Sequence, residues 1–223
     1  MSVDLDQSLA DLVLTRPAAA RALERLGLDY CCGGRQSLRE ACRERGLDAA
    51  TVAVVLEHEG EPVAVESTDW SRVPLAVLCT HIVEEHHARL RWELPRLSEL
   101  ADRVASVHGA VQPDLRALRA ELERLRAELE AHLAEEEREL FPVLAAEGGL
   151  ERALLERLLH DHDSTGAHLR RLRELAGDYA PETALCATHR SLLQGLHGLE
   201  LDLHQHVHEE NNILFPRALA AAR

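Results

Sequence analysis

Apolar and polar positions alternate with a helical period along most of the chain. After residue 73 this pattern extends over long segments that are separated by turn signals. The segments lie at about 74–108, 113–146, 150–176 and 182–211. The turn signals are Gly109 with Pro113, the pair Gly148–Gly149, and Gly177 with Pro181. Short connections between long helices predict an antiparallel up-down four-helix bundle over residues 74–223.

The pattern over residues 1–58 predicts shorter helices. Pro17 begins one of them and Gly27 ends it, while Ser37 caps the next, with Glu40 at the capping-box position. Residues 59–73 break the helical pattern and read as a linker. We therefore expect a small helical domain over residues 1–58, a linker over 59–73, and the bundle over 74–223.

Composition agrees with an all-α fold and limits the partners. Hydrophobic residues make up 46% of the chain and aromatic residues only 3%, and this mixture favours helices over a β-sandwich or barrel. The formal net charge is −14 and no basic patch stands out, which argues against nucleic acid as the main partner. The N-terminus has no signal-peptide core and no apolar run is long enough to span a bilayer. A cytoplasmic protein without a membrane partner is the expectation.

Histidine is over-represented, with 14 in the chain, and part of this excess lies in an internal repeat. The segment AHLAEEERELFP (131–142) matches QHVHEENNILFP (205–216). Each copy has a His, a Glu four residues later, and Leu-Phe-Pro beginning eight residues after the His. Spacing of four places His132 with Glu136, and His206 with Glu210, on one helix face.

Hairpin geometry adds two more histidines to these pairs. Residues equidistant from the turn of an antiparallel hairpin lie at the same height, and the predicted turns fall near the midpoints between successive histidines. His87, His132, His162 and His206 therefore come to one level of the bundle. His132 follows His87 by 45 residues and His206 follows His162 by 44, so the bundle reads as two copies of one helical hairpin.

Four histidines and two glutamates that converge inside a bundle suit two metal ions. Each ion would take two imidazoles, and Glu136 and Glu210 would bridge the ions. Nitrogen and oxygen ligands without thiolate favour iron or manganese over a structural zinc. The ligand set is closer to the hemerythrin type than to ferritin-like Glu-x-x-His sites. A lone helical His is usually solvated, so the prediction rests on the repeat and the common level together.

Further residues near the proposed ligands are candidates for contact with them rather than with the metal. Glu128 lies one turn before His132, although a solvated surface Glu is the alternative. His108 ends the first long helix and is either a site residue or a simple cap. The remaining neighbours are His81, His86, His160, His204 and His208.

Cys31 and Cys32 form a second candidate site. They lie in the loop DYCCGGRQSL, beside two glycines and before a helix N-terminus. Helix ends and Arg35 would lower the pKa of a thiol there, which suits redox chemistry or metal transfer. The alternative is that one Cys is a small buried hydrophobe and the other is incidental.

Three motifs together resemble a known family. The chain is similar to the iron–sulfur cluster repair di-iron proteins (the RIC family, YtfE/ScdA type) in DYCCGGRQSL, in HIVEEHH at 81–87 and in HEENNILFPRAL at 208–219. The resemblance covers nearly the whole chain and implies a hemerythrin-like domain behind a small domain with the Cys pair. His86 stands where the family motif has Tyr, and Asp161 stands where it has Glu beside the third-helix ligand.

The resemblance implies an iron site and a function. The family's two iron ions would be held by His87, His132, Glu136, His162, His206 and Glu210, bridged by carboxylates and an oxo or hydroxo group, and its Cys pair falls on Cys31 and Cys32. The implied function is repair of iron–sulfur clusters damaged by nitric oxide or peroxide, with damaged iron–sulfur proteins as partners. Alternatives are an oxygen or nitric oxide binder or sensor, and a nitric oxide reductase. The oligomeric state stays open, a homodimer included.

Overall fold

The computed structural model describes residues 3–58, 69–146 and 151–221. Its contacts divide the chain into two compact units. The first combines Met1–Val73 with Val207–Pro216, and the second combines Pro74–His206 with Arg217–Arg223. Residues 59–68 of the predicted linker and the predicted Gly148–Gly149 turn lie outside the described residues.

Short helices build the N-terminal part. They are α1 (Leu9–Thr15), α2 (Ala19–Arg25), α3 (Leu38–Arg45) and α4 (Ala49–His58). The predicted capping box is present, because the Ser37 side chain accepts from the Glu40 amide while the Glu40 carboxylate accepts from the Ser37 amide. Gly27 takes the left-handed conformation (φ 66°) just after α2, as a helix-ending glycine does. A core that includes Leu9, Leu23 and Tyr30 holds these helices together.

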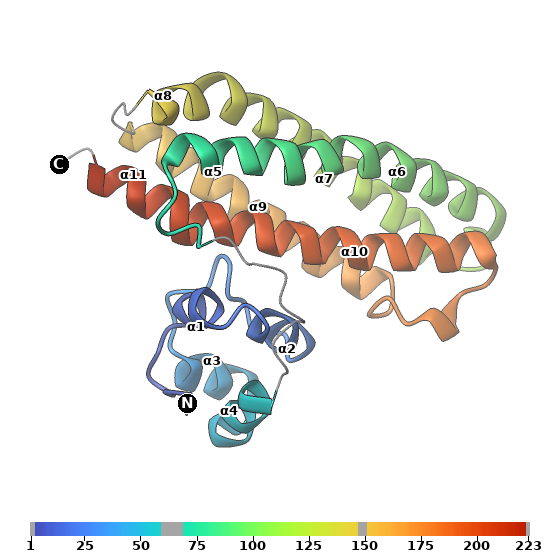
Figure 1. The fold of residues 1–223 in the computed structure, drawn as a ribbon. Helices are drawn as coiled ribbons and strands as arrows, with labels where there is room; N and C mark the ends of the chain where they lie inside the picture. Colours follow the sequence, from blue (N-terminus) through green and yellow to red (C-terminus); the bar gives the residue numbers. More distant parts are fainter. Residues whose placement is uncertain (1–2, 59–68, 147–150, 222–223) are drawn as a thin grey trace. The chain divides into compact units, whose positions relative to one another are not determined.

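Long helices build the bundle (Figure 1). The first hairpin comprises α5 (Leu75–His81), α6 (Ala88–His108), α7 (Asp114–Glu135) and α8 (Phe141–Ala145). The second comprises α9 (Arg152–Leu175), the 3-10 turn η3 (Pro181–Thr183), α10 (Ala187–Glu209) and α11 (Phe215–Ala221). The predicted all-α bundle is confirmed. Its core is a leucine-rich cluster to which α6, α7, α9 and α10 all contribute, so burial of one apolar face of each helix stabilises the bundle.

The long helices are interrupted by π-helical turns that the sequence pattern did not predict. These are η1 (Ile82–His87), η2 (Glu136–Leu140) and η4 (Glu210–Leu214). Pro142 and Pro216 follow η2 and η4 by two residues. Proline has no amide to donate and its ring crowds the carbonyl four residues earlier, so the repeated Leu-Phe-Pro explains why the α-helical ladder widens at both places.

Candidate metal centre

The six residues proposed as metal ligands lie together in the structure, in two groups of four. His87, Glu136, His206 and Glu210 form one group, and His132, Glu136, His162 and Glu210 form the other. Within each group the ligand atoms all lie within 4.8 Å of one another, and every one of these side chains is buried. Glu136 and Glu210 belong to both groups, as bridging carboxylates would.

The π turns place three of these six side chains. His87 ends η1, Glu136 begins η2 and Glu210 begins η4. A π turn adds a residue to one helical turn and rotates the side chains around it, and such turns are frequent at functional sites. The other three side chains project from ordinary α-helix: His132 from α7, His162 from α9 and His206 from α10.

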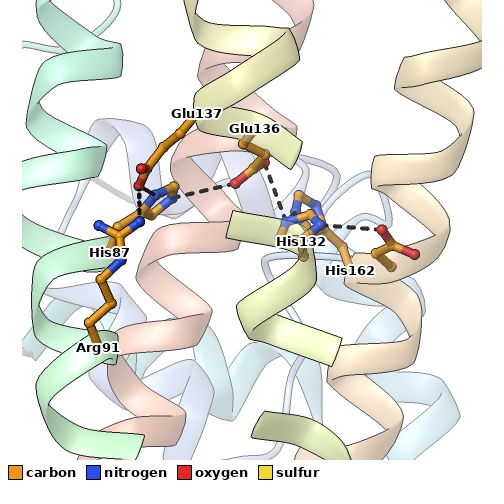
Figure 2. A network of polar contacts seen from close by, with 7 residues as sticks. His87, Arg91, His132, Glu136, Glu137 and His162 are labelled. Carbon is orange, nitrogen blue, oxygen red and sulfur yellow. Dashed lines mark hydrogen bonds and ion pairs between the residues drawn. The ribbon is translucent and has the colours of Figure 1, made fainter. Parts of the chain in front are cut away.

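Glu136 faces a different histidine with each carboxylate oxygen, as Figure 2 shows. Its Oε2 lies 3.4 Å from Nε2 of His87, and its Oε1 lies 3.3 Å from Nε2 of His132. The Nε2 atoms of His132 and His162 are 3.1 Å apart. Glu136 therefore stands between a histidine of one group and a histidine of the other.

In two of these histidines, the ring nitrogen that faces away from Glu136 contacts a carboxylate outside the two groups. The Nδ1 atom of His87 lies 2.7 Å from Oε1 of Glu137, which also accepts from the Arg91 guanidinium at 2.5 Å (Figure 2). The Nδ1 atom of His132 lies 3.3 Å from Oδ2 of Asp161. A carboxylate at Nδ1 fixes a ring so that its Nε2 faces a metal, and this is the usual arrangement around metal-binding histidines.

Glu137 is suited to this role by its charge. Partial burial acts to raise the pKa of its carboxyl, but hydrogen bonds from His87 and Arg91 outweigh burial and hold the pKa below its usual range. The carboxylate form therefore persists at neutral pH, where it favours an Nδ1–H tautomer of His87. Glu137 could not be selected from the sequence, because AEEERE is typical of a solvated helix face.

The residues present fit a pair of metal ions. Glu136 and Glu210 are both 0% exposed, and two carboxylates buried without a cation nearby would be costly. The six residues supply four imidazoles and two carboxylates that belong to both groups. This donor set suits divalent transition metals rather than calcium or magnesium.

The other predicted neighbours of the site fall at different places. Asp161 contacts His132 directly. Glu128 belongs to neither group of ligands; it accepts from Ser164 at 2.9 Å and lies 3.2 Å from His168. His108 is the last residue of α6 and belongs to neither group of ligands.

The Cys pair forms a group with Asp29, an acid that was not a candidate from the sequence. Cys31, Cys32 and Asp29 offer ligand atoms within 4.8 Å of one another. The sulfur of Cys31 lies 3.8 Å from that of Cys32 and 3.2 Å from Oδ1 of Asp29, and this oxygen also accepts from both cysteine amides. In the same compact unit, Asn212 donates to the Cys31 carbonyl at 3.2 Å.

The pKa of the Cys31 thiol is raised, whereas the sequence predicted that it would be lowered. Its hydrogen bond with Cys32, together with burial and the Asp29 carboxylate, raises its pKa well above the usual value. The expected lowering by a helix end and Arg35 does not hold for this residue, because negative groups and burial dominate its surroundings. Cys31 is buried, whereas Cys32 is half-buried and is the more accessible thiol.

Two family models match separate parts of the chain. The model of the hemerythrin HHE cation-binding domain matches residues 79–218. A domain of unknown function named ScdA_N matches residues 5–59. Within the described ranges, no helix combines the length and the apolar character needed to cross a membrane.

Three relatives that match over nearly their whole length are all iron–sulfur cluster repair proteins named YtfE. The chain is 34% identical over 215 residues to the iron–sulfur cluster repair protein YtfE of Pectobacterium carotovorum subsp. carotovorum, covering 96% of this chain and 97% of the relative. It is 37% identical over 215 residues to YtfE of Edwardsiella ictaluri, with the same coverage. It is 35% identical over 216 residues to YtfE of Musicola paradisiaca, covering 96% of each. The buried His/Glu groups, the two domain matches and these relatives place the chain in the YtfE family of iron–sulfur cluster repair proteins.

Proposed function

We propose that this protein holds two iron ions in its His/Glu groups and repairs iron–sulfur clusters damaged by nitric oxide or peroxide. The single observation that carries the proposal is the position of Glu136, whose two oxygens face His87 and His132 at similar distances. A carboxylate placed in this way serves two metal ions rather than one. The names of the relatives supply the class of client, a damaged iron–sulfur protein.

The choice of iron follows from ligand chemistry. Histidine and carboxylate without thiolate suit iron or manganese, and the four-histidine set is that of the hemerythrin type. Bound iron would supply a redox-active centre able to bind small diatomic ligands. One ion would be held by His87 and His206 and the other by His132 and His162. Glu136 and Glu210 would offset the positive charge of both ions.

Cys31 and Cys32 would act on iron or electrons in the repair. Thiols are softer ligands than any residue of the buried groups, and Cys32 is accessible enough to meet another molecule. The Asp29 carboxylate beside them adds an oxygen ligand. The two sites would therefore bind iron differently, one tightly through nitrogen and carboxylate and one more weakly through sulfur.

The test compares variants in a strain that lacks the protein. Activity of a cluster enzyme such as aconitase is followed after a nitric oxide pulse, with His132→Ala, with Cys31→Ala/Cys32→Ala, and with His197→Ala and Cys186→Ala as controls away from both sites. We expect His132→Ala to lose iron and repair, the double Cys variant to keep iron but repair slowly, and both controls to match wild type.

Two results of this experiment would change the proposal. Wild-type recovery in both site variants would overturn the repair function. Normal recovery in the double Cys variant alone would mean that the bundle acts without the thiols. Anaerobic addition of nitric oxide to the reduced protein would then measure whether the di-iron site binds nitric oxide or turns it over.

A further inference from the structure

A third group of metal-binding side chains lies beside the proposed pair. His81, His86 and Glu209 offer ligand atoms that all lie within 4.8 Å of one another. His86 and Glu209 are only 6% and 2% exposed, whereas His81 is half-buried. His81 ends α5, His86 belongs to η1 and Glu209 ends α10, so the group lies where two helices pass into π turns.

His86 is held in the same way as the histidines of the pair. Its Nδ1 lies 3.2 Å from Oδ1 of Asp202, whose side chain is 9% exposed. Glu137 at His87 and Asp161 at His132 repeat this arrangement. A ring whose Nδ1 is engaged by a carboxylate coordinates a metal through Nε2. Asp202 thus fixes His86 in the orientation that a ligand needs.

The donor set indicates which ion would bind and how firmly. Two imidazoles and one carboxylate suit a divalent first-row transition metal, and three protein ligands leave coordination positions open. A structural site is closed by four protein ligands. A three-ligand site with one half-buried histidine is therefore suited to an ion that exchanges rather than to one that stays.

The third group adjoins the pair through two direct links. The His86 ring stacks on His206, with centroids 5.1 Å apart and planes 6° apart. Glu209 directly precedes Glu210, which belongs to both groups of the pair. At its other side, the His81 ring meets the His86 ring edge-on at 5.7 Å. The residues thus form a short series from the half-buried His81 to the buried ligand His206.

We propose that His81, His86 and Glu209 form a third, exchangeable site for a divalent transition-metal ion. Its role rests on the proposed function: it would hold an iron ion that enters or leaves the pair. Asp202 is a positioning residue, because it touches His86 and not the ion. The site predicts that a protein whose pair is already filled binds one more ion.

Equilibrium dialysis of the iron-loaded protein against Co²⁺ tests this site. Iron and cobalt are counted separately by elemental analysis, and the diferric absorption reports whether the pair is intact. We expect about one Co²⁺ per chain in addition to the iron. Glu209→Gln keeps the size of the side chain and removes its charge, and His86→Phe keeps a ring that stacks on His206. Each should weaken Co²⁺ binding about tenfold or more and leave the iron count unchanged.

Glu85→Gln is the matched control, because it removes an exposed carboxylate from the same π turn. It should bind Co²⁺ like wild type. The proposal is overturned if iron-loaded wild type binds no Co²⁺, if Co²⁺ only displaces iron, or if both site variants bind it normally. A protein that never takes up iron would instead contradict the proposed function, so the two failures are distinguishable.

Discussion

The Nε2 atoms of His132 and His162 lie 3.1 Å apart, and both rings are buried. Two nitrogens that bind one ion at about 2.1 Å and at a right angle to each other would be about 3.0 Å apart. The spacing thus suits a shared ion, with both nitrogens as lone-pair donors. Because Asp161 engages Nδ1 of His132, the Nε2 of that ring faces inward.

Glu136 is expected to be needed for both ions. Glu136→Gln keeps the shape of the side chain but removes the charge shared between His87 and His132, so the iron content should fall from about two ions per chain to below one. Elemental analysis and the diferric absorption measure this. Glu139→Gln, an exposed carboxylate three residues away, should keep both ions. Full iron content and an unchanged spectrum in Glu136→Gln would exclude a bridging role.

Glu137 is expected to act through His87 rather than on the metal. Glu137→Gln removes the carboxylate that accepts from His87 and Arg91. Loss of such an outer carboxylate weakens metal binding roughly tenfold or more, so a chelator should remove one of the two irons faster than from wild type. Glu84→Gln is the control, because Glu84 is exposed. Equal rates for Glu137→Gln and wild type would show that Glu137 does not position the ring.

The raised pKa of Cys31 has a testable pH dependence. The hydrogen bond with Cys32, burial and the Asp29 carboxylate raise the pKa of Cys31 well above that of a free thiol, so the thiol stays protonated at neutral pH. The stability that this contributes is present below the pKa of a free thiol and is lost at higher pH. Alkylation followed by mass spectrometry should therefore modify Cys32 before Cys31 at pH 7. Asp29→Asn keeps the oxygen that accepts from the two amides but removes the charge, so it should speed Cys31 alkylation, by about tenfold per pKa unit. An unchanged rate would mean that Asp29 does not raise this pKa.

The bundle is expected to hold iron without the N-terminal domain. All six proposed ligands lie after residue 80, so a chain of residues 74–223 should fold as a helical bundle and retain its iron. Circular dichroism and iron content measure this against the full-length protein. A shortened chain that stays helical but loses its iron would show that the N-terminal part is needed to complete the site.

The helices and the convergence of the six proposed ligands could be predicted because they depend on local patterns. Turn signals such as Gly109 fix where a hairpin reverses, and the distance along the helix from that turn sets which side chains meet. The pair His132/Glu136 recurs as His206/Glu210, and this repeat identified the height in the bundle at which the proposed ligands meet. Each of these relations is readable from spacing alone.

Two of the outer carboxylates, those of Glu137 and Asp202, could not be predicted because they depend on how the helices pack. The π turns change the side-chain register beside the site, and they bring Glu137 to His87 across two helices. Asp202 contacts His86 from 116 residues away in the sequence. A charged residue in a helix is usually solvated, so neither carboxylate carried a signal before the packing was known. The Leu-Phe-Pro repeat was the available signal for the π turns η2 and η4, but η1 has no such motif.

Anomalous diffraction at the iron absorption edge, from crystals of the iron-loaded protein, tests the central claim most directly. We predict two strong peaks, one between His87 and His206 and the other between His132 and His162, with Glu136 and Glu210 contacting both. A single peak, or peaks away from these histidines, would contradict a di-iron centre bridged by the two glutamates.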